Sequence, residues 1–320
     1  NKFSYDENNP LGTTILIIDE LSMVDLTLFY RLLLAGRFIK KLILIGDHEQ
    51  LPPILPGDIL KDFINSKKLP VITLNRIFRQ EGDGNIIPFT YAIRNFCQID
   101  VDLFNGNDLL FIPKPPLEIT GEVVNIVGKL VDLGFNFYDI QILAPMYEGS
   151  SGINELNNRI QEKFNPKNNK LKDVQIDKYI YRLGDKILQL KNQPEDEIYN
   201  GDIGTLIKID KEDGLVLTID FEGNEVEIKG DKLENIALAY AVSIHKSQGS
   251  EYPIVIVVIS KDSYHMLRKD LIYTAFTRAK IKLIIVGDLP LLQRAVSKTN
   301  KAIEKTLLPK RLKNAFELLN

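Results

Sequence analysis

Two neighbouring acids, Asp19 and Glu20, end the apolar run ILIIDE (15–20) and could support metal-assisted hydrolysis. A carboxylate at the end of a buried strand can hold Mg²⁺ directly or through water, and the next carboxylate can orient or deprotonate an attacking water. Acids after a strand can also cap the N-terminus of a helix. The pair alone therefore leaves both hydrolysis and helix capping open.

A second polar segment, GDHEQLPP (46–53), follows another apolar run. Its Gln50 is a neutral amide that can contact both a terminal phosphate and a water, which suits a sensor of hydrolysis. The segment LNRIFRQ (74–80) then supplies Arg79. A guanidinium group donates several hydrogen bonds from one planar fork, so it can stabilise charge that develops on a phosphoryl group.

A third polar segment, SIHKSQGSEYP (243–253), precedes a further apolar run. Its side chains can donate hydrogen bonds to phosphates of a nucleotide or of a nucleic-acid backbone. These donors are Ser243, His245, Lys246, Ser247 and Gln248. Farther on, LIYTAFTRAK (271–280) places Arg278 near the end of a helical pattern. Arg278 taken alone could simply be a charge that interacts with the C-terminal end of the helix dipole.

The elements that must position these residues are short runs of Ile, Val and Leu that end in polar or acidic residues. Continuous apolar runs are typical of parallel strands buried on both faces. Helical patterns at 25–36 and 152–164 alternate with them, which predicts α/β architecture. Ligands of such sheets bind at the carboxyl ends of the strands. The runs span 15–20, 41–47, 139–145, 253–260 and 282–288, and the acids at their ends include Asp19, Asp47 and Asp288.

Residues 176–236 differ, because short strand-like pieces alternate there with Gly, Asn and Asp turns. They predict a small antiparallel barrel inserted between two α/β portions, or else an elaborated β edge of one domain. The segment FIPKPPLE (111–118) is predicted to be a stiff connector. The basic tail 298–319 has a helical pattern that could pack its Leu and Ala side chains inward or contact a DNA backbone.

Length, composition and charge limit the classes of protein to which the chain can belong. A chain of 320 residues with 44% hydrophobic and 26% charged residues is typical of a globular protein of about two domains. The single cysteine, Cys97, cannot form an internal disulfide, which favours a reducing compartment. No apolar run approaches the roughly 20 residues needed to span a bilayer. The net charge of −3 means that a polyanion would need a local basic stripe.

Taken in order, the polar segments resemble motifs II to VI of superfamily 1 helicases. The residue sequence of these segments is more similar to the RecD-like branch, particularly to RecD2-type ATP-dependent DNA helicases, and this similarity extends from about residue 13 to about residue 290. The strings that carry the resemblance are DELSMVD, GDHEQLPP, IFRQ, QILAPMYEGSSGINELNNRIQEKFNP, RLGDKILQLKN, NGDIGTLI, HKSQGSEYP and LIYTAFTRAK.

This resemblance implies an α/β fold with two RecA-like parallel-sheet domains, the first incomplete, and an inserted small SH3-like β-barrel. The implied domains are a partial first RecA-like domain (1A) at 1–110, a second (2A) at 111–175 and 237–320, and the SH3-like insertion (2B) at 176–236. It also implies ATP and Mg²⁺ as cofactors and 5′-to-3′ movement on single-stranded DNA.

The resemblance implies a role for each matching residue. Asp19 would bind the metal, Glu20 would activate water, and Gln50 would sense the γ-phosphate. Arg79 and Arg278 would act on the γ-phosphate as cationic fingers. The nucleotide would be bound by Asp19, Gln50, Arg79, Gly249, Glu251 and Arg278, with Glu251 near the ribose, and the DNA by His245, Lys246 and Ser247.

The resemblance also implies an oligomeric state, binding partners and a cellular location. They are a monomer that binds ATP and either single-stranded DNA or a duplex with a 5′ overhang, and that works with recombination or repair proteins. The location would be cytoplasmic and nucleoid-associated, of a bacterial type, with no membrane contact.

A phosphate loop of the form G-x-x-x-x-G-K-[ST] is absent from the sequence. The one Gly-Lys pair, Gly128–Lys129, is followed by Leu130 and lacks the earlier glycine. In the family this loop precedes the acidic pair, so the chain is expected to be a piece of a longer protein that starts after the Walker A motif. Alone it should bind ATP weakly and not hydrolyse it. The alternatives are a non-catalytic DNA-binding adaptor on a decayed motor fold, or a relative of the Pif1 or conjugative-relaxase helicases.

Overall fold

The computed structural model describes residues 3–74, 84–95, 99–168, 173–212, 214–297 and 306–318, and the chain forms two compact units. The first unit comprises residues 1–78 together with 299–320, and the second comprises 79–298. The chain therefore leaves the first unit once and returns to it at its C-terminal end. The division into functional domains at 110, 175 and 236 stays a prediction.

The first unit is built on two parallel strands, β1 (Ile15–Ile18) and β2 (Lys41–Leu44), paired residue for residue. Helix α1 (Leu26–Ala35) connects them, and α8 (Leu308–Leu318) packs against α2 (Ile59–Ser66). The Asp25 carboxylate accepts hydrogen bonds from the backbone N–H groups of Thr27 at 2.8 Å and Leu28 at 3.0 Å, and these bonds fix the start of α1.

The β1–β2 sheet is buried on one face only. Ile18, Leu42 and Leu44 pack against a small core that includes Phe29 of α1. On the other face, Ile15 and Ile17 are 55% and 60% exposed. The expectation that this run would be buried on both faces is therefore wrong within the first unit, because no described element covers the outer face of β1.

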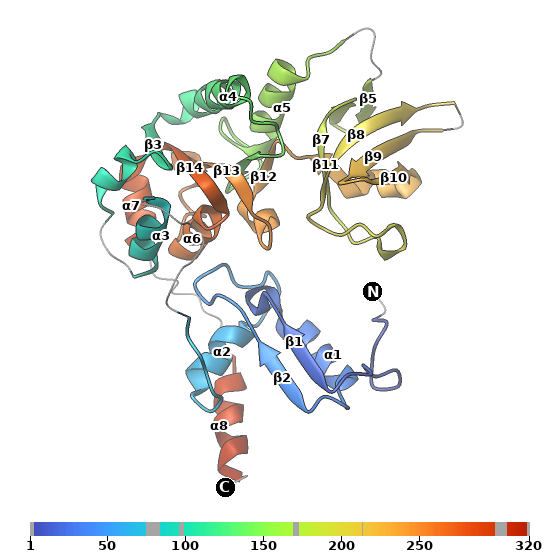
Figure 1. Ribbon diagram of the computed structural model, residues 1–320, viewed down its shortest axis with the longest axis vertical. Helices are drawn as coiled ribbons and strands as arrows, with labels where there is room; N and C mark the ends of the chain where they lie inside the picture. Colours follow the sequence, from blue (N-terminus) through green and yellow to red (C-terminus); the bar gives the residue numbers. More distant parts are fainter. Residues whose placement is uncertain are drawn as a thin grey trace. The chain divides into compact units, whose positions relative to one another are not determined.

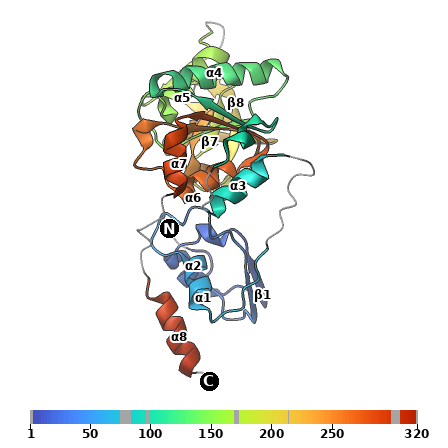
Figure 2. The same ribbon diagram turned by 90° about the vertical axis from the view of Figure 1, so that its left-hand side faces the viewer.

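The second unit contains a five-stranded parallel sheet of order β12-β4-β13-β14-β3. Helices α4 and α5 lie on one face, and α3, α6 and α7 lie on the other (Figures 1 and 2). Because both faces are covered, the central strands are almost wholly apolar and buried, as their sequence predicts. The strands are β3 (Leu109–Pro113), β4 (Ile140–Ala144), β12 (Ala241–Ser243), β13 (Tyr252–Ile259) and β14 (Ala279–Gly287). The helices are α3 (Ile86–Arg94), α4 (Pro116–Asp132), α5 (Ile153–Phe164), α6 (Lys269–Phe276) and α7 (Leu289–Ser297).

An antiparallel sheet of order β10-β9-β8-β7-β11 follows, accompanied by the hairpin β5–β6. Along β9 buried and partly buried residues alternate, which is typical of a strand with one face on a core. This sheet is the predicted SH3-like β-barrel. Its elements are β5 (Asp173–Ile176), β6 (Tyr179–Arg182), β7 (Lys186–Gln189), β8 (Ile203–Asp210), β9 (Val216–Phe221), β10 (Asn224–Lys229) and β11 (Ile236–Leu238).

The barrel and one side of the parallel sheet share a single apolar core. At their junction the buried side chain of Lys186 crosses from β7 to the start of β4. Its ammonium donates to the carbonyl oxygens of Phe137 at 2.9 Å and Ile140 at 3.1 Å, and to the amide oxygen of Gln141 at 3.0 Å. The barrel is thus bonded to the sheet through its interior.

The neighbouring Asp185 is fully buried and ties the barrel to α5. Its carboxylate accepts hydrogen bonds from Gln161 at 2.6 Å, Asn165 at 2.7 Å and the Tyr240 hydroxyl at 3.0 Å. The backbone N–H of Arg182 is a fourth donor, at 2.7 Å. Burial raises the pKa of Asp185, and these bonds act against that rise.

The prediction of an α/β fold with parallel sheets and an inserted barrel is confirmed. The prediction that 111–118 is a stiff connector is wrong. Its first residues complete β3, which pairs with β14, and Pro116 begins α4. A proline at the first position of a helix loses no hydrogen bond, because that N–H has no partner within the helix.

Candidate functional site

The acidic pair lies in a tight turn at the carboxyl end of β1. Glu20 adopts the left-handed conformation with φ 50°, and its N–H donates to the Asp19 carboxylate at 2.8 Å. The next residue, Leu21, donates to the carbonyl oxygen of Ile45 at 2.8 Å. The turn is therefore bonded to the segment that follows β2.

The helix-capping alternative for these acids is not what the described residues show. Glu20 precedes the short 3-10 helix η1 (Leu21–Met23), and its side chain makes no capping bond there. The cap of α1 is supplied by Asp25 instead. Asp19 is exposed and Glu20 is partly exposed. Both carboxylates are thus presented at the end of the strand.

The GDHEQLPP turn packs closely against the acidic turn. A Cβ atom on Gly46 would lie 3.1 Å from the backbone nitrogen of Ser22 and 3.2 Å from that of Leu21, so a glycine lets the two turns approach. Asp47 orders the turn, because its carboxylate accepts a hydrogen bond from the Glu49 N–H at 3.0 Å.

Gln50 follows in the same turn, and its N–H donates to the Asp47 carbonyl oxygen at 3.2 Å. Its side chain is buried, and its amide oxygen has no hydrogen-bond partner among the described residues. A buried amide oxygen without a partner costs free energy, so it is a point at which a ligand or water gains a bond.

The first unit therefore brings Asp19, Glu20 and Gln50 together at one edge of its sheet. Arg79 lies outside the described residues.

Arg278 is buried, 3% exposed, directly after α6. Its guanidinium donates to the carbonyl oxygen of Thr274 at 3.1 Å, in the last turn of α6, and to the carbonyl oxygen of Ser250 at 3.1 Å. The interaction of Arg278 with the C-terminal end of the helix, which the sequence left open, is thus present. The bond to Ser250 also joins Arg278 to the SIHKSQGSEYP segment, where Glu251 forms an ion pair with Lys280 at 3.7 Å.

The SIHKSQGSEYP segment begins as the 3-10 helix η5 (Ile244–Ser247), capped by Ser243. Gly249 follows with φ +78°, a conformation that L side chains rarely adopt. Ser247 is fully buried, and its hydroxyl donates to the Ile244 carbonyl at 2.8 Å. Ser247 therefore holds the turn from inside, while His245 and Lys246 are only partly buried.

The electrostatic surroundings of these two residues differ. Burial lowers the pKa of His245, and the nearby Arg268 lowers it further, while Asp270 acts in the opposite direction. Burial also lowers the pKa of Lys246, whose ammonium donates to the Asn200 amide oxygen at 2.7 Å. Asn200 belongs to the barrel, so the barrel reaches the polar segment.

The string NGDIG (200–204) contains nothing that indicates a contact for its asparagine, Asn200. Only the folded contact between Asn200 and Lys246 shows the connection. The buried Asp185 and Lys186 were missed as well, because a charged pair between apolar residues carries no pattern that indicates burial.

Magnesium is compatible with the donor set at the end of β1, since carboxylate oxygens are the ligands this ion prefers. Within the parts of the chain that the structure describes, no three His, Cys, Asp or Glu side chains form a metal-holding group. In the same parts of the chain, no helix is long and apolar enough to cross a bilayer.

Three family models match successive parts of the chain. An AAA domain matches residues 5–95, the SH3 domain of ATP-dependent RecD-like DNA helicases matches 156–221, and a UvrD-like helicase C-terminal domain matches 238–286. The ATP-dependent RecD2 DNA helicase of Deinococcus radiodurans is 32% identical over 306 residues, which cover 96% of this chain.

The chain resembles the RecD-like helicases over nearly its whole length.

Other RecD proteins are also similar to this RecD-like chain. The RecBCD enzyme subunit RecD of Buchnera aphidicola is 27% identical over 94% of the chain, and that of Mycolicibacterium smegmatis is 26% identical over 98%. The RecD-like chain spans 41% of the Deinococcus protein, 58% of the Buchnera protein and 57% of the Mycolicibacterium protein, about half the length of these relatives.

Solved structures of Pif1 helicases share the fold of the RecD-like chain. The Pif1 helicase from Bacteroides in complex with ADP-AlF3 and single-stranded DNA superposes with a TM-score of 0.54 at 20% identity, over 99% of this chain and 79% of that one. The Pif1 helicase from Candida albicans gives 0.54 at 19% identity, over 96% and 77%. These similarities support the α/β fold, and the matching SH3 family model supports the barrel.

Proposed function

We propose that this chain is the motor-core portion of an ATP-dependent DNA helicase or translocase that moves 5′ to 3′ on single-stranded DNA in recombination or repair. The observation that carries the proposal is the pairing of two turns, in which Asp19 and Glu20 stand beside the turn of Gln50. The relatives support it, since one is named an ATP-dependent RecD2 DNA helicase and others are RecBCD subunits.

In this proposal the acidic turn prepares water for attack on ATP. Asp19 would hold Mg²⁺, which would neutralise phosphate charge when bound, and Glu20 would orient and deprotonate the water. Gln50 offers an amide oxygen that lacks a partner among the described residues. Its amide can hydrogen-bond both the water and the terminal phosphate, so loss of that phosphate would change its bonding.

Two arginines and a turn of the second unit are given nucleotide-binding roles by the resemblance to RecD-like helicases. Arg79 and Arg278 act as cationic fingers, which are worth roughly 10³ to 10⁵ in rate in phosphoryl-transfer enzymes. Arg278 is held by the Ser250 carbonyl, so movement of the turn that contains Gly249 and Glu251 would move the guanidinium. This bond offers a route by which the nucleotide and the adjacent turn affect each other.

The proposed DNA contacts come from the same segment. Lys246 supplies a cation to a backbone phosphate. The lowered pKa of His245 keeps its imidazole neutral at pH 7, so it would act as a hydrogen-bond group and not as a charge. Ser247 contributes by holding η5 from within. The partners proposed are single-stranded DNA or a duplex with a 5′ overhang, with the protein acting as a cytoplasmic, nucleoid-associated monomer.

This chain alone is proposed to bind ATP weakly and to leave it unhydrolysed. Its sequence contains no G-x-x-x-x-G-K-[ST] loop, whose backbone amides and lysine would neutralise the phosphates. Turnover by the 320-residue chain, stimulated by single-stranded DNA and abolished by Glu20→Gln, would overturn this part of the proposal.

The motor function itself is tested in a chimera. This chain replaces the aligned part of the Deinococcus RecD2 helicase, and the ATPase activity with oligo-dT and the unwinding of a duplex with a 5′ overhang are measured. We expect both activities, and we expect Glu20→Gln in the chimera to abolish them with an unchanged melting temperature. A chimera that melts cooperatively, binds oligo-dT and hydrolyses no ATP would refute the proposal.

A further inference from the structure

The loop between β7 and β8 of the barrel, residues 190–202, reaches the proposed DNA-binding segment. Its Asn200 accepts a hydrogen bond from the Lys246 ammonium at 2.7 Å. Asn200 is uncharged, so it orients the ammonium and leaves its positive charge available. An ammonium has three N–H donors, and the bond to Asn200 uses one of them.

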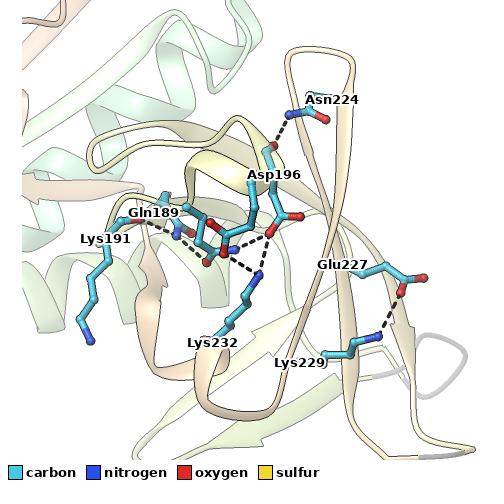
Figure 3. A network of polar contacts seen from close by, with 9 residues as sticks. Gln189, Lys191, Asp196, Asn224, Glu227, Lys229 and Lys232 are labelled. Atoms are coloured by element: carbon cyan, nitrogen blue, oxygen red, sulfur yellow. Dashed lines mark hydrogen bonds and ion pairs between the residues drawn. The ribbon is translucent and has the colours of Figure 1, made fainter. Parts of the chain in front are cut away.

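One end of this loop is fixed by a polar network (Figure 3). The Gln189 amide donates to the Lys191 carbonyl at 2.8 Å and to the Gln193 side chain at 3.0 Å. Gln193 in turn donates to the Asp196 carboxylate at 2.9 Å, and Lys232 forms an ion pair with that carboxylate at 2.7 Å. In Figure 3 the Lys191 ammonium points away from the network.

The other end of the loop is fixed by hydrogen bonds that its backbone N–H groups donate. The Tyr199 N–H donates to the Asp202 carboxylate at 2.7 Å, and the Asn200 N–H donates to the Asn192 side chain at 2.9 Å. Gly201 takes φ +106° and donates to the Gln189 carbonyl at 2.9 Å. The loop therefore holds Tyr199 next to the residue that contacts Lys246.

The ring of Tyr199 is 49% exposed. The bonds that fix the loop at this point come from its backbone, so the ring is available for a contact with a ligand. Single-strand binding sites combine a basic groove with aromatic rings on which bases stack. The loop thus carries an exposed ring at Tyr199 and, at the next residue, the side chain that holds the Lys246 ammonium, so both kinds of group come from one segment.

We propose that the barrel loop 190–202 forms one wall of the single-strand site, with Tyr199 as a base-stacking residue and Asn200 as a residue that positions Lys246 for a backbone phosphate. The inference rests on the proposed DNA-binding role of Lys246 and adds a second element to that site. The loop is already fixed without nucleic acid, so binding would order few groups and the stacking energy would appear largely as affinity.

The test measures the affinity of the 320-residue chain for a fluorescein-labelled oligo-dT by anisotropy, over a series of NaCl concentrations. The variants are Tyr199→Ala, Asn200→Ala, Lys246→Met and the double variant Asn200→Ala/Lys246→Met. Tyr91→Ala is the matched control, because Tyr91 is 54% exposed on a different element, α3. Thermal melting shows that each variant is folded.

Stacking and charge give different signatures. Tyr199→Ala should weaken binding by roughly 5- to 150-fold without changing the slope of log affinity against log salt, since no charge is lost. On an abasic oligonucleotide Tyr199→Ala should bind like the unsubstituted chain. Lys246→Met should make the slope shallower by about 0.7. Asn200→Ala should weaken binding on its own but add nothing when Lys246→Met is present, which a merely structural loss would not reproduce.

The possible failures are distinguishable. A chain that does not bind oligo-dT, or a slope unaffected by Lys246→Met, overturns the proposed DNA-binding role of Lys246 and this inference with it. A chain that binds through Lys246 while Tyr199→Ala matches Tyr91→Ala overturns the stacking role alone. Additive losses in Asn200→Ala/Lys246→Met overturn the positioning role of Asn200.

Discussion

Lys186 should make the second unit more stable as the pH rises above neutrality. Lys186 is 3% exposed, and burial lowers its pKa from the ordinary value of 10.5 to about 7, while the smaller effect of Asp139 acts in the opposite direction. Between these two pH values the unfolded chain binds a proton that the folded chain does not. Stability must then rise with pH across this interval.

The size of the effect follows from the linkage relation. One proton of difference gives about 1.4 kcal/mol per pH unit, so the free energy of unfolding should increase by about 2 kcal/mol between pH 7.5 and 9.0. Burial also raises the pKa values of Tyr181 and Tyr240, so these buried phenols stay protonated over this range. The rise should then be assignable to Lys186.

The assay is urea unfolding of the chain and of Lys186→Met at several pH values, followed by circular dichroism. Subtracting the Lys186→Met curve removes contributions from all other groups. The pKa itself can be read from the ¹³Cε resonance of Lys186 in lysine-labelled protein, which is absent from the variant. Parallel stability curves for the two proteins, together with a resonance that titrates near 10, would refute the reasoning.

Three further predictions concern stability. Asp185→Ala should lower the free energy of unfolding by about 3 kcal/mol or more, because four donors lose a buried acceptor, and an unchanged urea midpoint would contradict this. Gly287→Ala should abolish folding, since its Cβ would lie 1.9 Å from the Ile259 carbonyl oxygen, and a soluble variant with the original melting temperature would disprove it. Ile256→Thr in the covered sheet should lower the free energy of unfolding by about 2 kcal/mol. Ile17→Thr on the open face of β1 should change the free energy of unfolding by less than about 0.5 kcal/mol. Equal decreases in the urea midpoint of the two variants would show that β1 is covered.

The sequence predicted the strands that repeat Ile, Val and Leu, because that pattern depends only on local burial. It missed β12, which has three residues and continues from the barrel after only two intervening residues. It took 111–118 for a connector because prolines usually interrupt regular structure, although Pro113 ends β3 and Pro116 begins α4.

In the candidate site, too, some features could be predicted from the sequence and others depend on the folded structure. The acidic pair and Gln50 could be proposed from the sequence because polar residues after an apolar run are visible there. The burial of Ser247 and the contact between Lys246 and Asn200 were not, because both depend on packing between segments far apart in the chain. The role of Asp185 in joining α5 to the barrel was missed for the same reason.

The common interior of the barrel and the parallel sheet has a practical consequence for dissecting this protein. A barrel cut out of the chain would expose apolar side chains that now belong to this common core, and a second unit deprived of its barrel would expose the complementary surface. Neither piece should be obtainable as an independent folded domain, and amide hydrogens on the two sheets should exchange with solvent in a single cooperative event.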